Sequence, residues 1–282
     1  MVSLSYRQKR LLSQTIMYAV AAIIMIYCLF PIAWIFITSI KPPGAEFHIP
    51  IEYIPSKVSL DNYIEIFVEH KFHYYLLNSL VVASATTILV LAIGSLSAYA
   101  IARLRFKFRI SSLLTILVVG MMPSIVMILP IFLIIRELGL MNTWLGLIIT
   151  HAVFSLPITV WLLASYFAEL PFDLEDAAKI DGYTPSSIYR KIIMPLSVPG
   201  LFSAGILAFI ASWGEFMFAL TLTHTIQART ALVLITTLPG AYHLKWGMIN
   251  AGVILTLIPI IVIVLVFQKW VMRGLTAGAV KY

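Results

Sequence analysis

The chain has 282 residues, of which 61% are hydrophobic and 11% are charged, and its mean hydropathy is +0.99. Soluble domains have roughly a quarter of their residues charged, so this composition excludes a soluble protein and indicates one whose solvent is lipid. The formal net charge of +7 does not indicate nucleic-acid binding, because Lys and Arg are spread between apolar stretches. Cys28 is the sole cysteine, which excludes an intrachain disulfide and a cysteine-based metal site.

Six apolar segments are long enough to cross a bilayer as helices, which takes about 20 residues each. They cover approximately residues 15–39, 77–102, 110–135, 145–167, 200–223 and 248–270. These segments lack the alternation of barrel strands, so we predict an all-α polytopic membrane protein with one transmembrane domain over residues 1–282. The first segment is too long for a cleaved signal peptide, and we expect it to be retained.

The distribution of basic residues predicts the orientation in the membrane. With the N-terminus inside, only six of the 19 Lys and Arg fall outside, namely Lys41, Lys57, Lys71, Arg136, Arg229 and Lys245. Cytoplasmic loops carry the excess of such residues, so we expect both termini to be cytoplasmic in a multi-pass protein of the cytoplasmic (inner) membrane. The run from Arg103 to Arg109 is most simply a topology anchor attracted to anionic lipid.

Small residues and prolines mark special points within the spans. Gly94, Ala98 and Ala102 recur every four residues, which would let another helix approach closely. Prolines lie within four other spans and should bend or break them, at Pro31, Pro123, Pro130, Pro157 and Pro259. Structural kinking and a pathway lined by irregular helices explain these prolines equally well.

The outer segment from Lys41 to Tyr75 is polar. Ser59 is expected to cap a short amphipathic helix that begins near Asp61. His70 and His73 in the same segment have no convincing third ligand, so we predict no metal site there.

A cytoplasmic segment over residues 170–199 is too long for a simple turn. Asp173 can cap a helix whose first turn carries the acidic residues Glu175 and Asp176, which is favourable at the positive end of a helix dipole. Ala177 and Ala178 would give this helix a small, smooth face.

The second half of this segment predicts a hinge and a further helix. Gly182 fits the position just past a helix end, where a left-handed residue is wanted. Thr184 and Pro185 are typical of the cap and first residue of a helix, which would end at Pro195 and Pro199. Such a protrusion suits a groove on another protein and would pass a displacement to the fifth span.

These residues resemble the EAA loop of ABC importer permeases. The match is carried by Glu175, Asp176, Ala177, Ala178, Asp181 and Gly182, followed at fixed distance by Ile192, Met194 and Pro195. Asp176 replaces a Glu of the pattern and Met194 a Leu. The stretches 196–199, 213–216 and 274–278 are similar to the carbohydrate branch, in particular to MalG-like subunits, although Gly214 stands where that branch usually has Asn.

The resemblance implies a permease subunit that moves a sugar or oligosaccharide (maltose- or trehalose-like) by alternating access. In such permeases this loop is a coupling helix that docks in a cleft of the ATPase. The implied partners are a second, MalF-like permease, two ATPase subunits that hold ATP and Mg, and an external sugar-binding protein facing the loop His224–Gly247. The chain itself would need no cofactor and would catalyse no reaction.

Glu215 is the only acidic residue inside a predicted span, with no basic partner evident in the spans. Such carboxylates are expensive to bury and are by default functional hypotheses, so Glu215 either contacts the transported sugar or a gate, or bonds a neighbouring helix. Trp213 and Phe216 either stack on sugar rings or, more often for aromatic residues, serve in packing.

Other classes of function fit less well. No phosphate-binding glycine loop and no cluster of catalytic groups is present, which argues against an ATPase and against a membrane-embedded enzyme. A stand-alone secondary carrier or channel remains the alternative, and it predicts transport by the purified chain alone.

Overall fold

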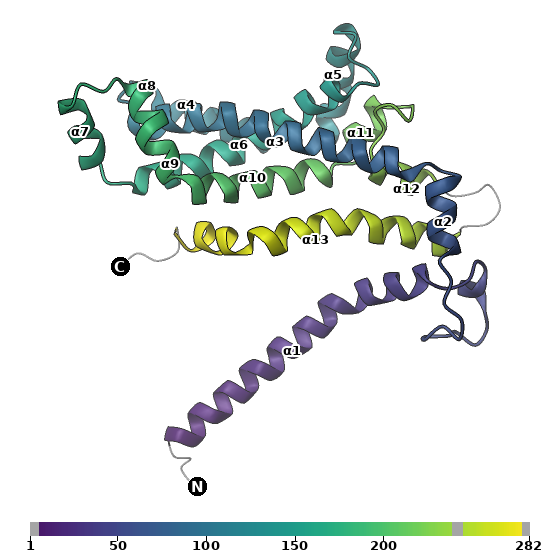
Figure 1. Ribbon diagram of the computed structural model, residues 1–282. Coiled ribbons are helices and arrows are strands. Elements are labelled where there is room, and N and C mark those ends of the chain that lie inside the picture. Colours follow the sequence, from purple (N-terminus) through teal and green to yellow (C-terminus); the bar gives the residue numbers. More distant parts are fainter. Residues whose placement is uncertain (1–5, 239–244, 278–282) are drawn as a thin grey trace. The chain divides into compact units, whose positions relative to one another are not determined.

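The computed structural model describes residues 6–238 and 245–277, in which the regular elements are all helical (Figure 1). The helices are α1 (Tyr6–Ser39), α2 (Asp61–Val68), α3 (Phe72–Arg103), α4 (Arg109–Gly120), α5 (Ser124–Glu137), α6 (Trp144–Glu169), α7 (Asp173–Ile180), α8 (Pro185–Ile188), α9 (Met194–Leu196), α10 (Val198–Trp213), α11 (Met217–Leu222), α12 (Ala231–Thr237) and α13 (Trp246–Ala277). A 3₁₀ turn η1 (Ala45–Phe47) follows α1, and a π-helical turn η2 (Tyr189–Ile193) joins α8 to α9.

Within the described ranges, four helices are long and apolar enough to cross a membrane, and the number is up to six if each of two bent pairs is one span. The four are Arg10–Ser39, Phe72–Arg103, Trp144–Glu169 and Trp246–Gln268. The bent pairs are α4 with α5, at 94°, and Pro185–Leu196 with α10, at 78°. The all-α polytopic class is thereby confirmed. The third expected span is broken between α4 and α5, and the fifth is interrupted between α10 and α11, while the 78° bend lies just before the fifth span.

The prolines act differently from one another. Pro123 stands between α4 and α5, where a proline cannot continue the i→i−4 bonding, and it breaks the third expected span. Pro31, Pro130, Pro157 and Pro259 lie inside uninterrupted helices. The expectation that prolines bend or break the spans is therefore met as a break at Pro123, and the other four break no helix.

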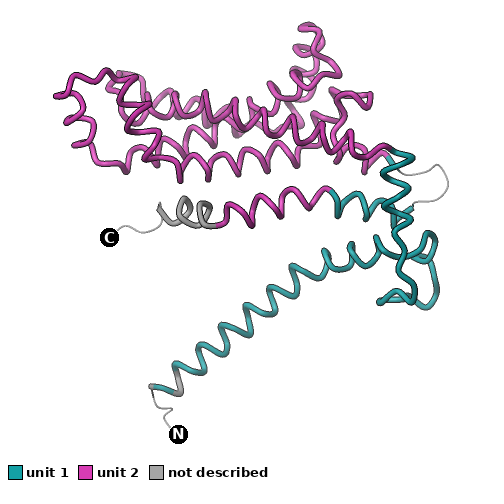
Figure 2. The backbone as a smooth tube through the Cα atoms, viewed as in Figure 1, with its two compact units in different colours: residues 1–70, 238–255 teal, residues 71–237, 256–282 magenta. Residues whose placement is uncertain are grey.

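The described residues divide into two compact units (Figure 2): residues 1–70 with 238–255, and residues 71–237 with 256–282. In the second unit α3, α6 and α10 pack against one another (Figure 1). A Cβ on Gly94 of α3 would lie 3.1 Å from Thr159 Cγ2 of α6, so the small residue is needed for the close approach, as predicted. Ala98, one turn on, is fully buried.

In the first unit, α2 is tied to the end of α1. The Asn62 amide donates to the carbonyls of Ser39, at 3.0 Å, and Lys41, at 2.8 Å. The helix begins at Asp61, as predicted, but Leu60 rather than Ser59 holds the cap position; the Ser59 hydroxyl accepts the Asp61 N–H at 3.0 Å. Glu65, Glu69 and His70 have ligand atoms within 4.8 Å of one another, but Glu65 already accepts a hydrogen bond from Lys245.

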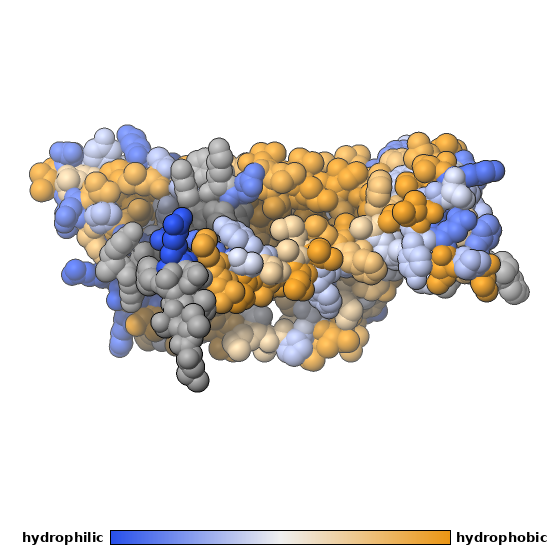
Figure 3. Space-filling model, turned by 90° about the horizontal axis from the view of Figure 1, so that it is seen from below, coloured by the Kyte–Doolittle hydropathy of each residue, from blue (hydrophilic) through white to orange (hydrophobic). Residues whose placement is uncertain are grey.

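The surface agrees with lipid as solvent. Hydrophobic residues form broad areas of the face in Figure 3, and many large apolar side chains are exposed, such as Ile26 in α1 and Ile88 in α3. A chain in water would bury such side chains, so these faces meet lipid or another protein.

Candidate functional site

The helix α7 has one buried and one exposed face. Glu175 and Ala178 are buried, with 3% and 4% of their surface exposed, whereas Asp176 and Ala177 are exposed and Ile180 is 88% exposed. The expected smooth face formed jointly by Ala177 and Ala178 is therefore wrong, because adjacent residues of a helix point about 100° apart. Ala178 packs inward, and the outer face consists of Asp176, Ala177 and Ile180.

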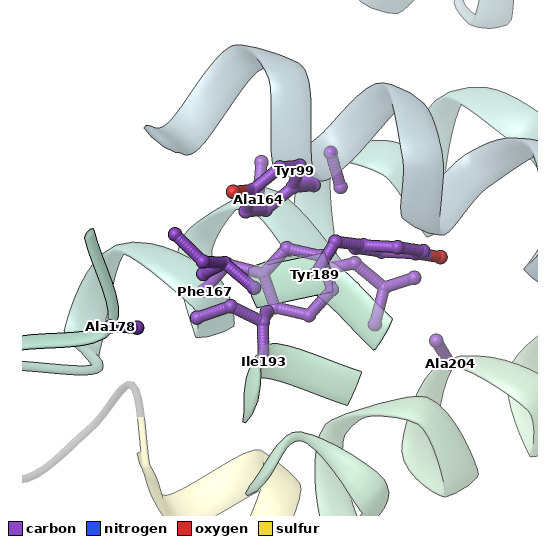
Figure 4. Packing of buried hydrophobic residues seen from close by; sticks show 10 residues of the cluster. Tyr99, Ala164, Phe167, Ala178, Tyr189, Ile193 and Ala204 are labelled. Atoms are coloured by element: carbon purple, nitrogen blue, oxygen red, sulfur yellow. The ribbon is translucent and has the colours of Figure 1, made fainter. Parts of the chain in front are cut away.

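Ala178 belongs to a hydrophobic cluster that joins α7 to the bundle (Figure 4). Its buried members are Ala98, Tyr99, Leu163, Ala164, Phe167, Ala178, Ile188, Tyr189, Ile193 and Ala204. They come from α3, α6, α7, α8, η2 and α10, so the whole segment 170–199 is seated on the ends of the long helices.

Both ends of α7 can be compared with prediction. Asp173 is the first helical residue rather than the cap: Phe172 holds the cap position without a side-chain bond. Three acidic residues nevertheless fall in the first turn, where their negative charges interact favourably with the positive end of the helix dipole. At the other end Gly182 has φ +81°, as predicted, and the Tyr183 N–H bonds the Ala178 carbonyl at 2.9 Å.

The second helix of the segment starts as predicted. The Thr184 hydroxyl accepts the Ser187 N–H at 3.4 Å, and Pro185 is the first helical residue. The π-helical turn follows, and the Tyr189 hydroxyl hydrogen-bonds Ser95 of α3 at 2.7 Å. A π-turn of this kind often marks a functional site.

Arg103, the last residue of α3, contacts three residues of the segment. Its Nε lies 3.2 Å from Glu175 Oε1, its Nη2 donates to the Leu170 carbonyl at 2.5 Å, and its guanidinium carbon is 4.2 Å from the Phe172 ring centre. The Arg103 side chain is fully buried. The expectation that Arg103 anchors the chain to anionic lipid is therefore wrong, and sequence reasoning missed this ion pair.

A polar cavity of about 530 Å³ borders this ion pair. Asp176 and Lys179 also line it, and Lys179 Nζ donates to Asp176 Oδ1 at 2.7 Å. That hydrogen bond lowers the pKa of the exposed Asp176 carboxyl, so Asp176 is ionised at neutral pH. The exposed face of α7 is therefore charged as well as apolar.

Glu215 lies in the break between α10 and α11. Its Oε1 accepts the Phe218 N–H at 2.8 Å and its Oε2 accepts the Ala219 N–H at 3.0 Å. The carboxylate therefore provides hydrogen-bond acceptors for N–H groups in the first turn of α11, which have no partner within the helix. His151 Nε2 of α6 is 3.1 Å from Oε2, and His151 Nδ1 is 2.7 Å from Ser212 Oγ. The interpretation that Glu215 has no basic partner is thus wrong: His151, a lone histidine in an apolar span, was overlooked.

The two aromatic candidates beside Glu215 are held by packing. Trp213 is 3% exposed, its indole N–H donates to the Thr256 carbonyl at 3.2 Å, and its ring stacks on Phe209 at 5.6 Å. Phe216 packs against a second cluster that includes Phe218 and Leu222. Neither aromatic ring is fully exposed in this conformation, since Trp213 is buried and Phe216 is partly buried.

The loop expected at His224–Gly247 is described up to residue 238 and from 245 onward. Its start is fixed by two asparagines. Asn142 Oδ1 accepts the N–H groups of His224 and Thr225, and Asn78 Nδ2 donates to the carbonyls of Ile226 and Arg229. The sequence did not single out these asparagines.

Comparison with known proteins gives consistent results. The family model described as "Binding-protein-dependent transport system inner membrane component" matches residues 90–277. The trehalose transport system permease protein SugB of Mycobacterium tuberculosis is 43% identical over 257 residues, which are 90% of this chain and 93% of that protein. The trehalose/maltose transport system permease protein MalG of Thermococcus litoralis is 39% identical, covering 94% and 96%.

A solved structure supports the fold. A chain of a bacterial ABC transporter that imports the acidic polysaccharide alginate superposes with a TM-score of 0.80 at 21% identity, covering 95% of this chain and 99% of that one. At this identity the likeness concerns the fold alone, and it agrees with a chain of broken and continuous membrane helices.

Proposed function

Because this chain belongs to the family of binding-protein-dependent transport system inner membrane components, we propose that it is a MalG-like permease subunit of an ATP-driven importer for a sugar or oligosaccharide. Support for the substrate class comes from relatives at 43% and 39% identity that are named as trehalose and trehalose/maltose permeases. A maltose- or trehalose-like disaccharide is the substrate that these names favour.

The observation that carries the proposal is the two-sided α7. Its inner face is held by Arg103 and the cluster around Ala178, while Ile180 is 88% exposed on its outer face. A helix that is rigidly seated yet offers an apolar side chain outward is suited to docking in a groove of another protein. The partner proposed for this face is an ATPase subunit, contacted by Asp176, Ala177, Ile180 and Asp181.

The complete importer would contain further chains. We infer a second, MalF-like permease, two ATPase subunits that hold ATP and Mg, and an external sugar-binding protein. This chain would bind no cofactor. Both termini and the α7 segment would face the cytoplasm, since the basic residues concentrate on that side.

The path of a displacement can be followed along the chain. A movement of α7 would be transmitted through Gly182 to α8 and η2. From there it would cross the 78° bend and reach α10, which ends at the break where Glu215 lies. Packed helices transmit displacement because their interfaces shift between discrete arrangements. In an outward-open state Trp213, Glu215 and Phe216 would then line the translocation pathway.

Two variants of Gly182 test the coupling. A Cβ at Gly182 would meet nothing within 4 Å, so a substitution is penalised only through φ +81°. Gly182→Val should cost about 1–2 kcal/mol of left-handed strain and lower both uptake and the amount of ATPase that co-purifies. Gly182→Asn is the matched control, because Asn tolerates this conformation, and it should remain close to the unchanged chain.

The proposal fails if the tagged, unchanged chain is purified from membranes in mild detergent without an ATPase. Sugar uptake by the purified chain alone in vesicles would instead favour the stand-alone carrier.

A further inference from the structure

We propose that Arg103 is a positioning residue that makes α7 and the cytoplasmic end of α3 move as one body, so that a stroke on α7 drives α3 directly as well as α10. This inference rests on the proposed function, because it concerns how the coupling segment acts. It concerns a residue that lies outside that segment, 67 positions before Leu170.

The contacts of Arg103 are distributed so as to fix α7 in position. It binds the Leu170 carbonyl at the end of α6, lies over the Phe172 ring at the start of α7, and pairs with Glu175 one turn later. Three contacts at successive points define an orientation, which a single contact would not. The fork of donors on a guanidinium allows this, whereas a Lys ammonium acts as a point charge.

The energetics favour positioning over simple stabilisation. Both charged groups are buried, with 0% and 4% of their side chains exposed. The contact between Nε and Oε1 does not have hydrogen-bond geometry, and Arg103 Nη1 also has no hydrogen-bond partner among the described residues. Burying such a pair costs desolvation that an incompletely bonded pair does not recover, so an apolar pair of similar volume would be at least as stable.

The surroundings give α3 a second link to the segment. Tyr99, one turn before Arg103, donates its hydroxyl to the Pro185 carbonyl at 3.3 Å, and its ring lies 5.2 Å from that of Tyr189. Gly182, which has a left-handed backbone conformation, lies between these points of contact and is the proposed hinge. The segment is thus clamped to α3 on both sides of its hinge, and α3 is a full-length membrane helix.

A covalent link tests the proposal in the assembled importer. Leu104, which is 39% exposed, and Asp173, also exposed, are the chain neighbours of Arg103 and Phe172, whose guanidinium and ring lie 4.2 Å apart. Leu104→Cys and Asp173→Cys in a Cys28→Ser background are therefore the pair to be linked with a short bis-maleimide. Bridging residues 104 and 173 should leave sugar uptake unchanged, since the proposal requires no relative motion between α7 and the cytoplasmic end of α3. Uptake that is lost on bridging while ATP hydrolysis continues would overturn the proposal. Each single-Cys variant treated with the reagent is the control.

The double variant Arg103→Met with Glu175→Met supplies the converse test. It keeps an apolar pair in place of the charges, so α7 stays seated, but the directed contacts are gone. Sugar transported per ATP hydrolysed should fall by roughly 5- to 150-fold, the range of typical coupling free energies, and bridging residues 104 and 173 should restore it. An unchanged ratio in the unbridged double variant would contradict the proposal.

The two hypotheses fail differently. If no ATPase accompanies the unchanged chain, the proposed function is wrong. If the ATPase is present and the bridged chain no longer transports, only the role of Arg103 is wrong.

Discussion

Two acid–base pairs, one at each end of the bundle of the second unit, have different roles: Arg103 and Glu175 are both buried, whereas the Glu215 side chain beside the buried His151 is 18% exposed. Glu215 accepts two backbone N–H groups and contacts His151, so its carboxylate is well satisfied. Glu175 contacts Arg103 without hydrogen-bond geometry, and in the part of the chain that the structure describes its Oε1 has no hydrogen-bond partner. The first pair completes local architecture at a helix break, whereas the second fixes where a protruding helix stands.

The chemical types of the two bases match this division. Arg remains charged at any physiological pH, which suits a link that must hold throughout a transport cycle. His151 is bonded on both ring nitrogens, and a neutral ring with its hydrogen on Nε2 can donate to Glu215 while Nδ1 accepts from Ser212. A buried acid is therefore not by itself a mark of the translocation pathway, because its partners decide its role.

The largest effect is expected at the Arg103–Glu175 pair when only one partner is removed. Arg103→Met leaves the Glu175 carboxylate buried and unpaired, which should cost about 3–5 kcal/mol. We expect a large drop in the Tm of the purified complex and a loss of the ATPase subunit that co-purifies with the chain. A Tm within a degree of the unchanged chain would show that Glu175 is not truly buried.

Removing the carboxylate of the Glu215–His151 pair should have a smaller effect. Glu215→Ala leaves two N–H groups of α11 and the His151 ring without their partner, at a cost of about 1–3 kcal/mol for a buried unsatisfied group. Uptake in membrane vesicles should fall while the complex still assembles. Glu215→Gln, which keeps one accepting oxygen, is the control and should retain more uptake; normal transport by Glu215→Ala would remove this residue from the pathway.

His151 allows its two bonds to be separated. Gln places its amide near Nε2 and Asn near Nδ1, so His151→Gln preserves the contact with Glu215 and His151→Asn that with Ser212. If the Glu215 contact matters for transport, His151→Gln should exceed His151→Asn in uptake, with a stability difference of about 1 kcal/mol. Equal uptake by both variants would assign His151 to packing alone.

The smallest effect is expected at the exposed pair on α7. Lys179→Met removes the partner of Asp176, and both side chains are more than half exposed, so the Tm should not change measurably. Because the pKa of Asp176 is lowered, the stabilisation from this pair is present above about pH 3.9, the usual pKa of an Asp, and is lost as pH falls through the lower folded value. A clear drop in Tm at pH 7 would mean that charge, rather than burial, governs α7.

Local signals in the sequence predicted the positions of the helices well. Gly182 and the pair Thr184 and Pro185 were predicted correctly because left-handed backbone and capping depend on single residue types. The break at Pro123 was among those predicted from the prolines. The interruption between Trp213 and Met217 was not placed, since hydropathy averages over a window and does not detect a bend within it.

The pairing of distant side chains was beyond the reach of one sequence. Arg103 and Glu175 are separated in the chain by α4, α5 and α6, and nothing in either neighbourhood specifies that they meet. The same holds for His151 and Glu215. The assignment of Ala178 to an inner face follows from helix phase, but only once the phase is known from packing. The roles assigned to the site residues stay predictions.

The exposed apolar side chains of α7 also affect the chain during its biogenesis. Phe172, just before α7, and Leu174 and Ile180 within it are 53%, 40% and 88% exposed, on a segment that we propose faces the cytoplasm. Large apolar side chains exposed to water favour association with other apolar surfaces. A newly inserted copy without its partner subunits would thus self-associate through α7. Overproduction of this chain alone should yield oligomers, and the variant Ile180→Ser should not form them.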